Sequence, residues 1–211
     1  MTPLHQRHKV FPPDFIVTLR GLVGVHQSIY RTTPPQGIYF EALVEEAFRR
    51  IKKPVTVIEA GGRNQPRHDL LVDNQKISLK TETGISTHEG HITITKLCTT
   101  EREPWQAHVL IQRVMDHLAR YDIILMFRAV WKPRAIRYQL VEIPVGTLRR
   151  IEKVTPQVVG RRKGRQSLGA DVIRHGERLF RVHFDASDGK CSIRNLGIQH
   201  CVLLEEWEVR L

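Results

Sequence analysis

Hydrophobic residues recur three and four positions apart in two long segments, at 40–51 and 105–121. This spacing predicts two helices, each with one buried face. The apolar positions of the first are Phe40, Leu43, Val44, Ala47, Phe48 and Ile51. Lys52, Lys53 and Pro54 follow at once, and cations and a proline are typical of a helix C-terminus. Further helices are predicted over 15–30 and 145–153.

Apolar or alternating runs between and after these segments predict β-strands. The predicted strands cover 55–59, 69–72, 76–80, 92–97, 123–130, 136–143, 179–184, 191–196 and 201–204. Asp73, Asn74 and Gln75 separate the second and third of them, which predicts a hairpin. The order helix, strand, hairpin, strand, helix, strand predicts an α/β fold with a mixed central sheet flanked by helices.

The length of 211 residues fits a single domain with an ample core. Within it we expect an N-terminal arm over 1–36, which ends in a breaker cluster of threonine, proline and glycine. A core over 37–154 and a β-rich, basic C-terminal extension over 155–211 follow. A separate small C-terminal domain is the alternative interpretation.

Charge is the unusual feature of the composition, with 33 Lys and Arg against 22 Asp and Glu, a net charge of +11. Such a balance favours a polyanionic partner, either nucleic acid or an anionic membrane surface. The longest purely apolar stretch is the five-residue run 123–127, far below the ~20 residues of a spanning helix. The three cysteines are scattered without CxxC spacing, and the N-terminus has no apolar signal segment. We therefore expect a cytoplasmic, nucleic-acid-directed protein without a membrane partner.

The predicted hairpin also brings candidate catalytic side chains together. If Asp73 pairs with Lys76, the alternation of side chains places Asp69, Ser78 and Lys80 on one face of the sheet. The other face is then wholly apolar, with Leu70, Val72, Ile77 and Leu79. An acid, a hydroxyl and an amine at one strand end suit phosphodiester hydrolysis, since a carboxylate can hold Mg²⁺ and a lysine can orient the attacking water. Glu41 and Glu45 are candidates for a second acid.

These residues resemble the PD-(D/E)XK nuclease superfamily. The resemblance covers about residues 37–130 and consists of Gly37–Glu41, Asp69 and the triplet Ser78–Lys80. It implies that Asp69 is a metal-binding acid, Lys80 the catalytic lysine and Glu41 the first-helix glutamate, a second metal ligand. Two positions depart from the motif. His68 replaces the proline before the acid, and Ser78 replaces the second acid, so Ser78 would only line the site.

Members with a non-acidic residue at this position recruit a carboxylate from elsewhere, and Glu41, Glu45 and Glu82 are the candidates. The resemblance further implies a type II restriction endonuclease that uses Mg²⁺, cuts double-stranded DNA and acts as a homodimer on a palindromic site. Glycines at 160 and 164 bracket a basic loop that we expect to contact DNA. The expected DNA contacts are Arg63, Arg67, Thr81, Glu82, Arg161, Arg162, Lys163 and Arg165.

Each feature has a simpler interpretation. Asp69 and Lys80 can form a surface ion pair, Glu45 can pair with Arg49 along its helix, and the basic loop can be merely solvated. Two alternative functions also stay open. One is a structure-specific or repair nuclease. The other is a non-catalytic DNA-binding protein that keeps the scaffold without the second acid.

Overall fold

A computed structural model describes residues 10–57, 70–100, 103–159 and 166–211. The chain forms two compact units. The first comprises 1–88, 121–143 and 201–211, and the second comprises 89–120 and 144–200. Among the described residues, no helix is both long and apolar enough to span a bilayer.

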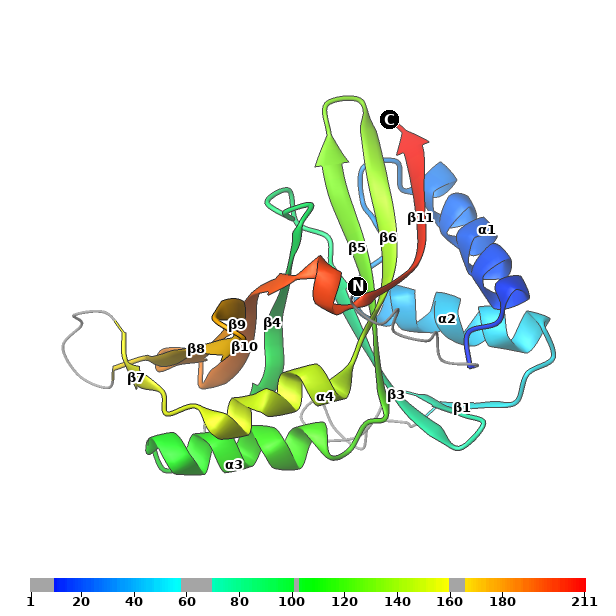
Figure 1. The fold of residues 1–211 in the computed structure, drawn as a ribbon. Helices are drawn as coiled ribbons and strands as arrows, with labels where there is room; N and C mark the ends of the chain where they lie inside the picture. The colour runs from blue at the N-terminus through cyan, green and yellow to red at the C-terminus, as the bar shows by residue number, and fades with distance from the viewer. Residues whose placement is uncertain (1–9, 58–69, 101–102, 160–165) are drawn as a thin grey trace. The chain divides into compact units, whose positions relative to one another are not determined.

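The first unit contains a six-stranded mixed sheet with strand order β1-β2-β3-β5-β6-β11 (Figure 1). Its strands are β1 (Val55–Val57), β2 (Leu70–Val72), β3 (Gln75–Glu82), β5 (Ile123–Lys132), β6 (Ala135–Ile143) and β11 (Val202–Arg210). β3 and β5 run parallel and the other neighbouring pairs are antiparallel. The mixed α/β class predicted from the sequence is thereby confirmed.

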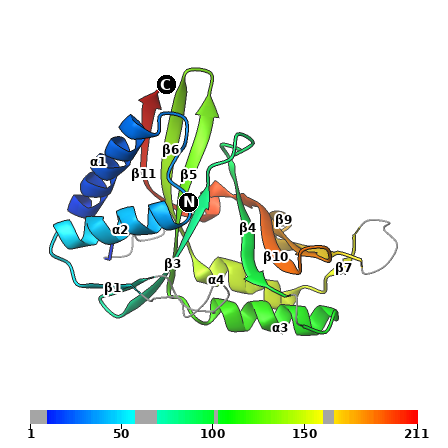
Figure 2. The ribbon, with the colours of Figure 1, turned by 180° about the vertical axis from the view of Figure 1, so that it is seen from behind.

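Helices α1 (Pro13–Ile29) and α2 (Ile38–Arg50) pack on one side of this sheet. Figure 2 shows the two helices together, seen from behind. Their buried residues share one hydrophobic core with the odd-numbered residues of β3 and β5. Phe15 stacks on Phe48 with ring centroids 4.2 Å apart, and Phe40 stacks on Phe127 at 5.1 Å. The aromatic contacts therefore fasten α1 to α2 and α2 to the sheet.

The β2–β3 hairpin keeps its predicted faces but not its predicted register. Leu70 pairs with Ile77 and Val72 with Gln75, so the turn residues are Asp73 and Asn74. Both have positive φ, 49° and 62°, as a two-residue type I′ turn requires, and Asp and Asn tolerate this conformation best after glycine. The expected pairing of Asp73 with Lys76 is therefore wrong by two residues. Because the shift is even, the apolar face survives: Leu70, Val72, Ile77 and Leu79 are all buried.

The second unit contains a five-stranded antiparallel sheet with strand order β4-β10-β9-β8-β7. Its strands are β4 (His91–Thr99), β7 (Gln157–Val158), β8 (Leu168–Arg174), β9 (Glu177–Asp185) and β10 (Lys190–Gly197). Helix α3 (Ala107–Leu118), helix α4 (Val145–Leu148) and a 3₁₀ turn over Arg149–Lys153 form the helical layer of this unit. Another 3₁₀ turn covers Ile198–His200.

Two strands belong to sheets other than those the sequence order suggested. The strand predicted over 92–97 as part of the central sheet is β4, which pairs with β10 in the second unit. Conversely, β11 leaves the C-terminal region and pairs with β6 of the first sheet. Periodicity identifies a strand and its buried face, but the partner strand is set by contacts between residues far apart in sequence, such as Cys98 with Cys191.

Candidate active site

The even-numbered residues of β3 form a polar row on the sheet face opposite α1 and α2. Strand alternation places Ser78, Lys80 and Glu82 there. In the parallel register, Ser78 pairs with Ile124, Lys80 with Met126 and Glu82 with Arg128. Ser78 and Lys80 thus have apolar register partners, whereas Glu82 has a charged one.

Lys80 and Ser78 are brought together as the sequence predicted. The Lys80 Nζ donates to Ser78 Oγ at 2.8 Å and to the Leu79 carbonyl at 3.1 Å. Ser78 is 1% exposed and Lys80 is half-buried. The hydroxyl of Ser78 therefore accepts from the lysine, and two acceptors on its own strand orient the ammonium group. An ammonium held in a partly dehydrated position interacts more strongly with a phosphate oxygen than one in water.

Glu82 is engaged by a buried arginine. The Arg128 side chain is fully buried, and its Nε donates to Glu82 Oε2 at 2.7 Å. The other guanidinium nitrogens of Arg128 donate to the Gln139 side chain and, at 2.6 Å, to the His88 carbonyl. Gln139 in turn donates to Glu206 Oε2 at 2.7 Å. This network, which we call the Arg128 network, joins β3, β5, β6 and β11.

The Arg128 network was not anticipated from the sequence. Its signal was a single arginine inside the apolar run of 123–130, because a charge within a buried strand requires a partner. Cys201 lies near it: burial raises the pKa of the Cys201 thiol to about 12, and the charge of Arg128 opposes that rise. The thiol is therefore protonated at neutral pH and behaves as a small apolar group.

Glu41 lies in the first turn of α2, on the helical side of the sheet. The start of this helix is tied to the end of β3, because Thr83 Oγ1 donates to Gln36 Oε1 at 3.2 Å. Phe40 stacks on Phe127, which pairs with Thr81. The start of α2 thus packs on the part of the sheet that holds Thr81 and Phe127, from the side opposite Lys80. By alternation, Thr81 also points to that other side.

The remaining expected site residues lie outside the described part of the chain. These are Asp69, Arg63, Arg67, Arg161, Arg162, Lys163 and Arg165. Asp69 directly precedes Leu70, the first residue of β2. Glu45 is described, and its carboxylate contacts Arg49 one turn later, which confirms the helical ion pair as its interaction. The neighbouring Glu46 has a lowered pKa because Arg50 donates a hydrogen bond to it.

Mg²⁺ prefers oxygen donors and usually takes only one or two protein carboxylates. Glu41 and Asp69 have donors of this kind. Ser78 has only a hydroxyl, which already accepts from Lys80, and the Glu82 carboxylate is charge-compensated by Arg128. Within the described residues, no three His, Cys, Asp or Glu side chains are close enough to form a metal site. Glu41 and Asp69 stay the predicted metal ligands.

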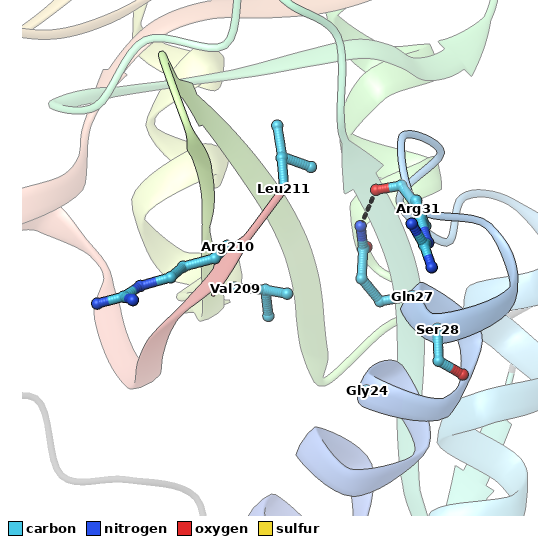
Figure 3. A pocket seen from close by; sticks show the side chains of 7 residues that line it. All are labelled: Gly24, Gln27, Ser28, Arg31, Val209, Arg210 and Leu211. Carbon is cyan, nitrogen blue, oxygen red and sulfur yellow. Dashed lines mark hydrogen bonds between the residues drawn. The ribbon is translucent and has the colours of Figure 1, made fainter.

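A pocket of about 390 Å³ lies elsewhere in the first unit, between the end of α1 and the end of β11 (Figure 3). It is lined by Gly24, Gln27, Ser28, Arg31, Val209, Arg210 and Leu211. The Gln27 side chain donates to the Arg31 carbonyl and accepts from the Tyr138 hydroxyl. Arg210 points away from both Gln27 and Arg31. These lining residues offer no acidic side chain and no converging catalytic groups, so the polar row of β3 is the better candidate.

Comparison with known proteins decides the family. The SmaI family model, described as type II site-specific deoxyribonuclease, matches residues 7–209. The chain belongs to this family. The chain is 26% identical to the type II restriction enzyme SmaI of Serratia marcescens over 174 residues. The matched residues cover 80% of this chain and 70% of SmaI. No solved structure matches the chain.

Membership of this family confirms the prediction of a type II restriction enzyme that acts on DNA. The mixed sheet and the contact between Ser78 and Lys80 were both predicted from the sequence. The assignment to the PD-(D/E)XK superfamily, the metal ligands and the individual DNA contacts stay predictions.

Proposed function

We propose that this deoxyribonuclease is a Mg²⁺-dependent, sequence-specific endonuclease that hydrolyses phosphodiester bonds of double-stranded DNA in the cytoplasm. The observation that carries the proposal is the Lys80 ammonium held by Ser78 on the polar row of β3. Family membership supports DNA as the substrate. The cysteine pattern favours the cytoplasm, as argued above.

Asp69 and Glu41 are the proposed metal ligands. Bound Mg²⁺ would supply a water of lowered pKa and compensate charge that develops on the phosphate. Asp69 precedes the strand that pairs with β3, and Glu41 belongs to the helix whose start is tied to the end of β3 by Thr83 and Gln36. Glu41 thus belongs to a helix tied to the strand that holds Lys80, and Asp69 is next in sequence to a strand paired with it.

Lys80 is the proposed group that positions the attacking water or binds a non-bridging phosphate oxygen. Its ammonium has three N–H donors, of which two are directed at Ser78 Oγ and the Leu79 carbonyl. Among the described residues nothing else accepts from Lys80, so its third donor is proposed to bind the substrate. Ser78 acts as a positioning residue, because its hydroxyl fixes the direction of that remaining N–H.

Glu82 is the weaker candidate for the missing second acid. A carboxylate bonded to a fully buried guanidinium at 2.7 Å has its charge compensated, and withdrawing it would break a buried ion pair, at a cost of several kcal/mol. We therefore favour Glu41 over Glu82 as ligand, and we keep Glu82 and Thr81 as proposed contacts to DNA. The other proposed contacts to DNA are Arg63, Arg67, Arg161, Arg162, Lys163 and Arg165.

The deoxyribonuclease is proposed to act as a homodimer. Six of the twelve exposed large hydrophobic residues in the described chain lie between 17 and 39. Among them, Tyr30 and Tyr39 both contact the ring of His26, so the ends of α1 and α2 form one apolar patch, together with Val25, Ile29 and Ile38. Residues 21–40 contain a single charged side chain, Arg31. In a chain of net charge +11, a second copy would meet little charge repulsion on this patch.

The oligomeric state tests this patch directly. We expect sedimentation to show a dimer for the wild type and a shift toward monomer for Ile29→Glu, because a buried unpaired carboxylate is costly. Ile85→Glu is the matched control, since Ile85 is 84% exposed and lies outside the patch. A monomeric wild type, or a dimer that tolerates Ile29→Glu as well as Ile85→Glu, would contradict the proposal.

The activity is tested by incubating plasmid or phage DNA with the enzyme in Mg²⁺ or in EDTA. Discrete fragments that form only with Mg²⁺ are the expected result. Cleavage confined to branched or damaged substrates would instead identify a structure-specific nuclease. Metal-independent binding without any strand break would identify the non-catalytic DNA-binding protein.

A further inference from the structure

The second sheet has one apolar face and one polar face. The apolar face carries Val172, Phe180, Val182 and Ile193, all buried. The helical layer of the unit contacts this sheet through β4 and β8. On the polar face, the register places Arg181 of β9 between Asp171 of β8 and Arg194 of β10.

Two arginines stand directly opposite each other on this polar face. Arg181 and Arg194 are register partners on adjacent antiparallel strands, where like charges destabilise a sheet. Arg181 is partly compensated, because its guanidinium donates to Asp171 at 3.1 Å. Arg178 shares the same carboxylate at 3.9 Å. Arg194 is exposed, and within the described part of the chain it has no ion-pair partner.

A glycine on β8 lies next to the Arg181 side chain. A Cβ at Gly169 would lie 3.2 Å from the Val182 carbonyl and 3.3 Å from a guanidinium nitrogen of Arg181. Glycine therefore leaves room for the Arg181 side chain to lie across β8. His183, two residues along the same face, has a lowered pKa because of burial first and the charge of Arg194 second. The imidazole therefore does not add to the positive charge at neutral pH.

Charge also concentrates in this part of the chain. Residues 144–200 contain twelve Lys and Arg against five Asp and Glu. They therefore contribute +7 of the net +11. An opposed arginine pair that lowers stability, in the most basic segment of the protein, is expected where a polyanion supplies the missing countercharge.

We propose that the polar face of the second sheet, centred on Arg181 and Arg194, binds the phosphate backbone of duplex DNA. The inference rests on the proposed function, since it takes DNA as the partner, but it assigns a surface separate from the row of β3. The contacts are to phosphates, so this face contributes affinity and orientation and leaves base recognition to other residues.

Equilibrium binding of the full-length protein tests this proposal without any cleavage. A labelled DNA duplex is titrated in EDTA, by fluorescence anisotropy, over a series of salt concentrations. For Arg194→Gln we expect affinity to fall about eightfold at 0.1 M salt, and the slope of log K against log salt to flatten by about 0.9, the value for one lost phosphate contact. Arg149→Gln is the matched control, because Arg149 is an exposed arginine in the 3₁₀ turn of the helical layer.

A thermal melt of the same variants separates binding from folding. Removing Arg194 relieves a like-charge pair, so Arg194→Gln is expected to keep or raise Tm while binding weakens. A variant that binds like Arg149→Gln would overturn the proposed surface and leave the nuclease proposal standing. If the wild type itself does not bind duplex DNA, both proposals fail.

Discussion

The two sheets differ in the burial and the pairing of their arginines. In the first sheet, Arg128 is fully buried and its guanidinium donates to Glu82, Gln139 and the His88 carbonyl. In the second sheet, Arg194 is exposed and faces another arginine, Arg181, across the strand pair. The first arrangement fixes a charge inside the protein, and the second leaves a charge available at its surface.

This difference suggests that the first sheet positions catalytic groups and that the second sheet binds the substrate. The buried Arg128 network holds β3, β5, β6 and β11 in one arrangement. It therefore helps to fix the position of β3, the strand that carries Lys80. A like-charge pair at the surface, of which only Arg181 has an acidic partner among the described residues, lowers stability and favours the binding of an anion.

Lys80→Ala is expected to have the largest effect. It removes the one cation held on the polar row of β3 by Ser78, and loss of a single preorganised electrostatic contact lowers kcat by about 100- to 1,000-fold. Initial rates of plasmid cleavage in Mg²⁺ measure the change. Lys76→Ala, on the same strand and the same face but exposed, should cleave at the wild-type rate. Equal rates for the two variants would remove Lys80 from the site.

Arg128→Leu is expected to destabilise the fold by about 3–5 kcal/mol, because Glu82 would lose its buried partner. Urea unfolding measures this free energy. Arg194→Gln, the matched substitution in the second sheet, should change it by less than about 0.5 kcal/mol, as surface substitutions usually do. Adding Glu82→Gln to Arg128→Leu should restore part of the loss. Equal stability of the two single variants would refute the contrast between the sheets.

The smallest effect concerns the titration of His183. Arg194 disfavours the protonated imidazole and so contributes to its lowered pKa. Arg194→Gln removes that positive charge, so the pKa of His183 should rise. A pH titration followed by NMR of the imidazole signals measures it, with Arg149→Gln as the control. An unchanged pKa would place the Arg194 guanidinium away from His183.

Much of the fold was predictable because its signals are local. The helix over 40–51 and the two faces of the β2–β3 hairpin follow from periodicity, and Ser78 and Lys80 meet because they are two residues apart on one strand. Strand partners were not predictable in the same way. The pairing of β4 with β10 and of β11 with β6 joins residues far apart in the sequence, and alternation says nothing about them.

The candidate site divides along the same line. Lys80 and its acceptor Ser78 were found from spacing, whereas the partners of Glu82 required the register of β5 against β3. The two-residue turn at Asp73 and Asn74 also depends on backbone conformation, which is why the predicted hairpin register was shifted. A register shift of two residues leaves every side chain on its predicted face of the sheet. Ser78 and Lys80 therefore share a face in both the predicted and the observed register.

We propose that Asp69 and Lys80 form the catalytic centre of a Mg²⁺-dependent endonuclease. The most direct test is cleavage of plasmid DNA by the wild type and by Asp69→Asn, each in Mg²⁺ and in EDTA, together with duplex binding by both proteins. We predict discrete Mg²⁺-dependent fragments for the wild type and no cleavage, with binding retained, for Asp69→Asn. Cleavage by Asp69→Asn at the wild-type rate would contradict the claim.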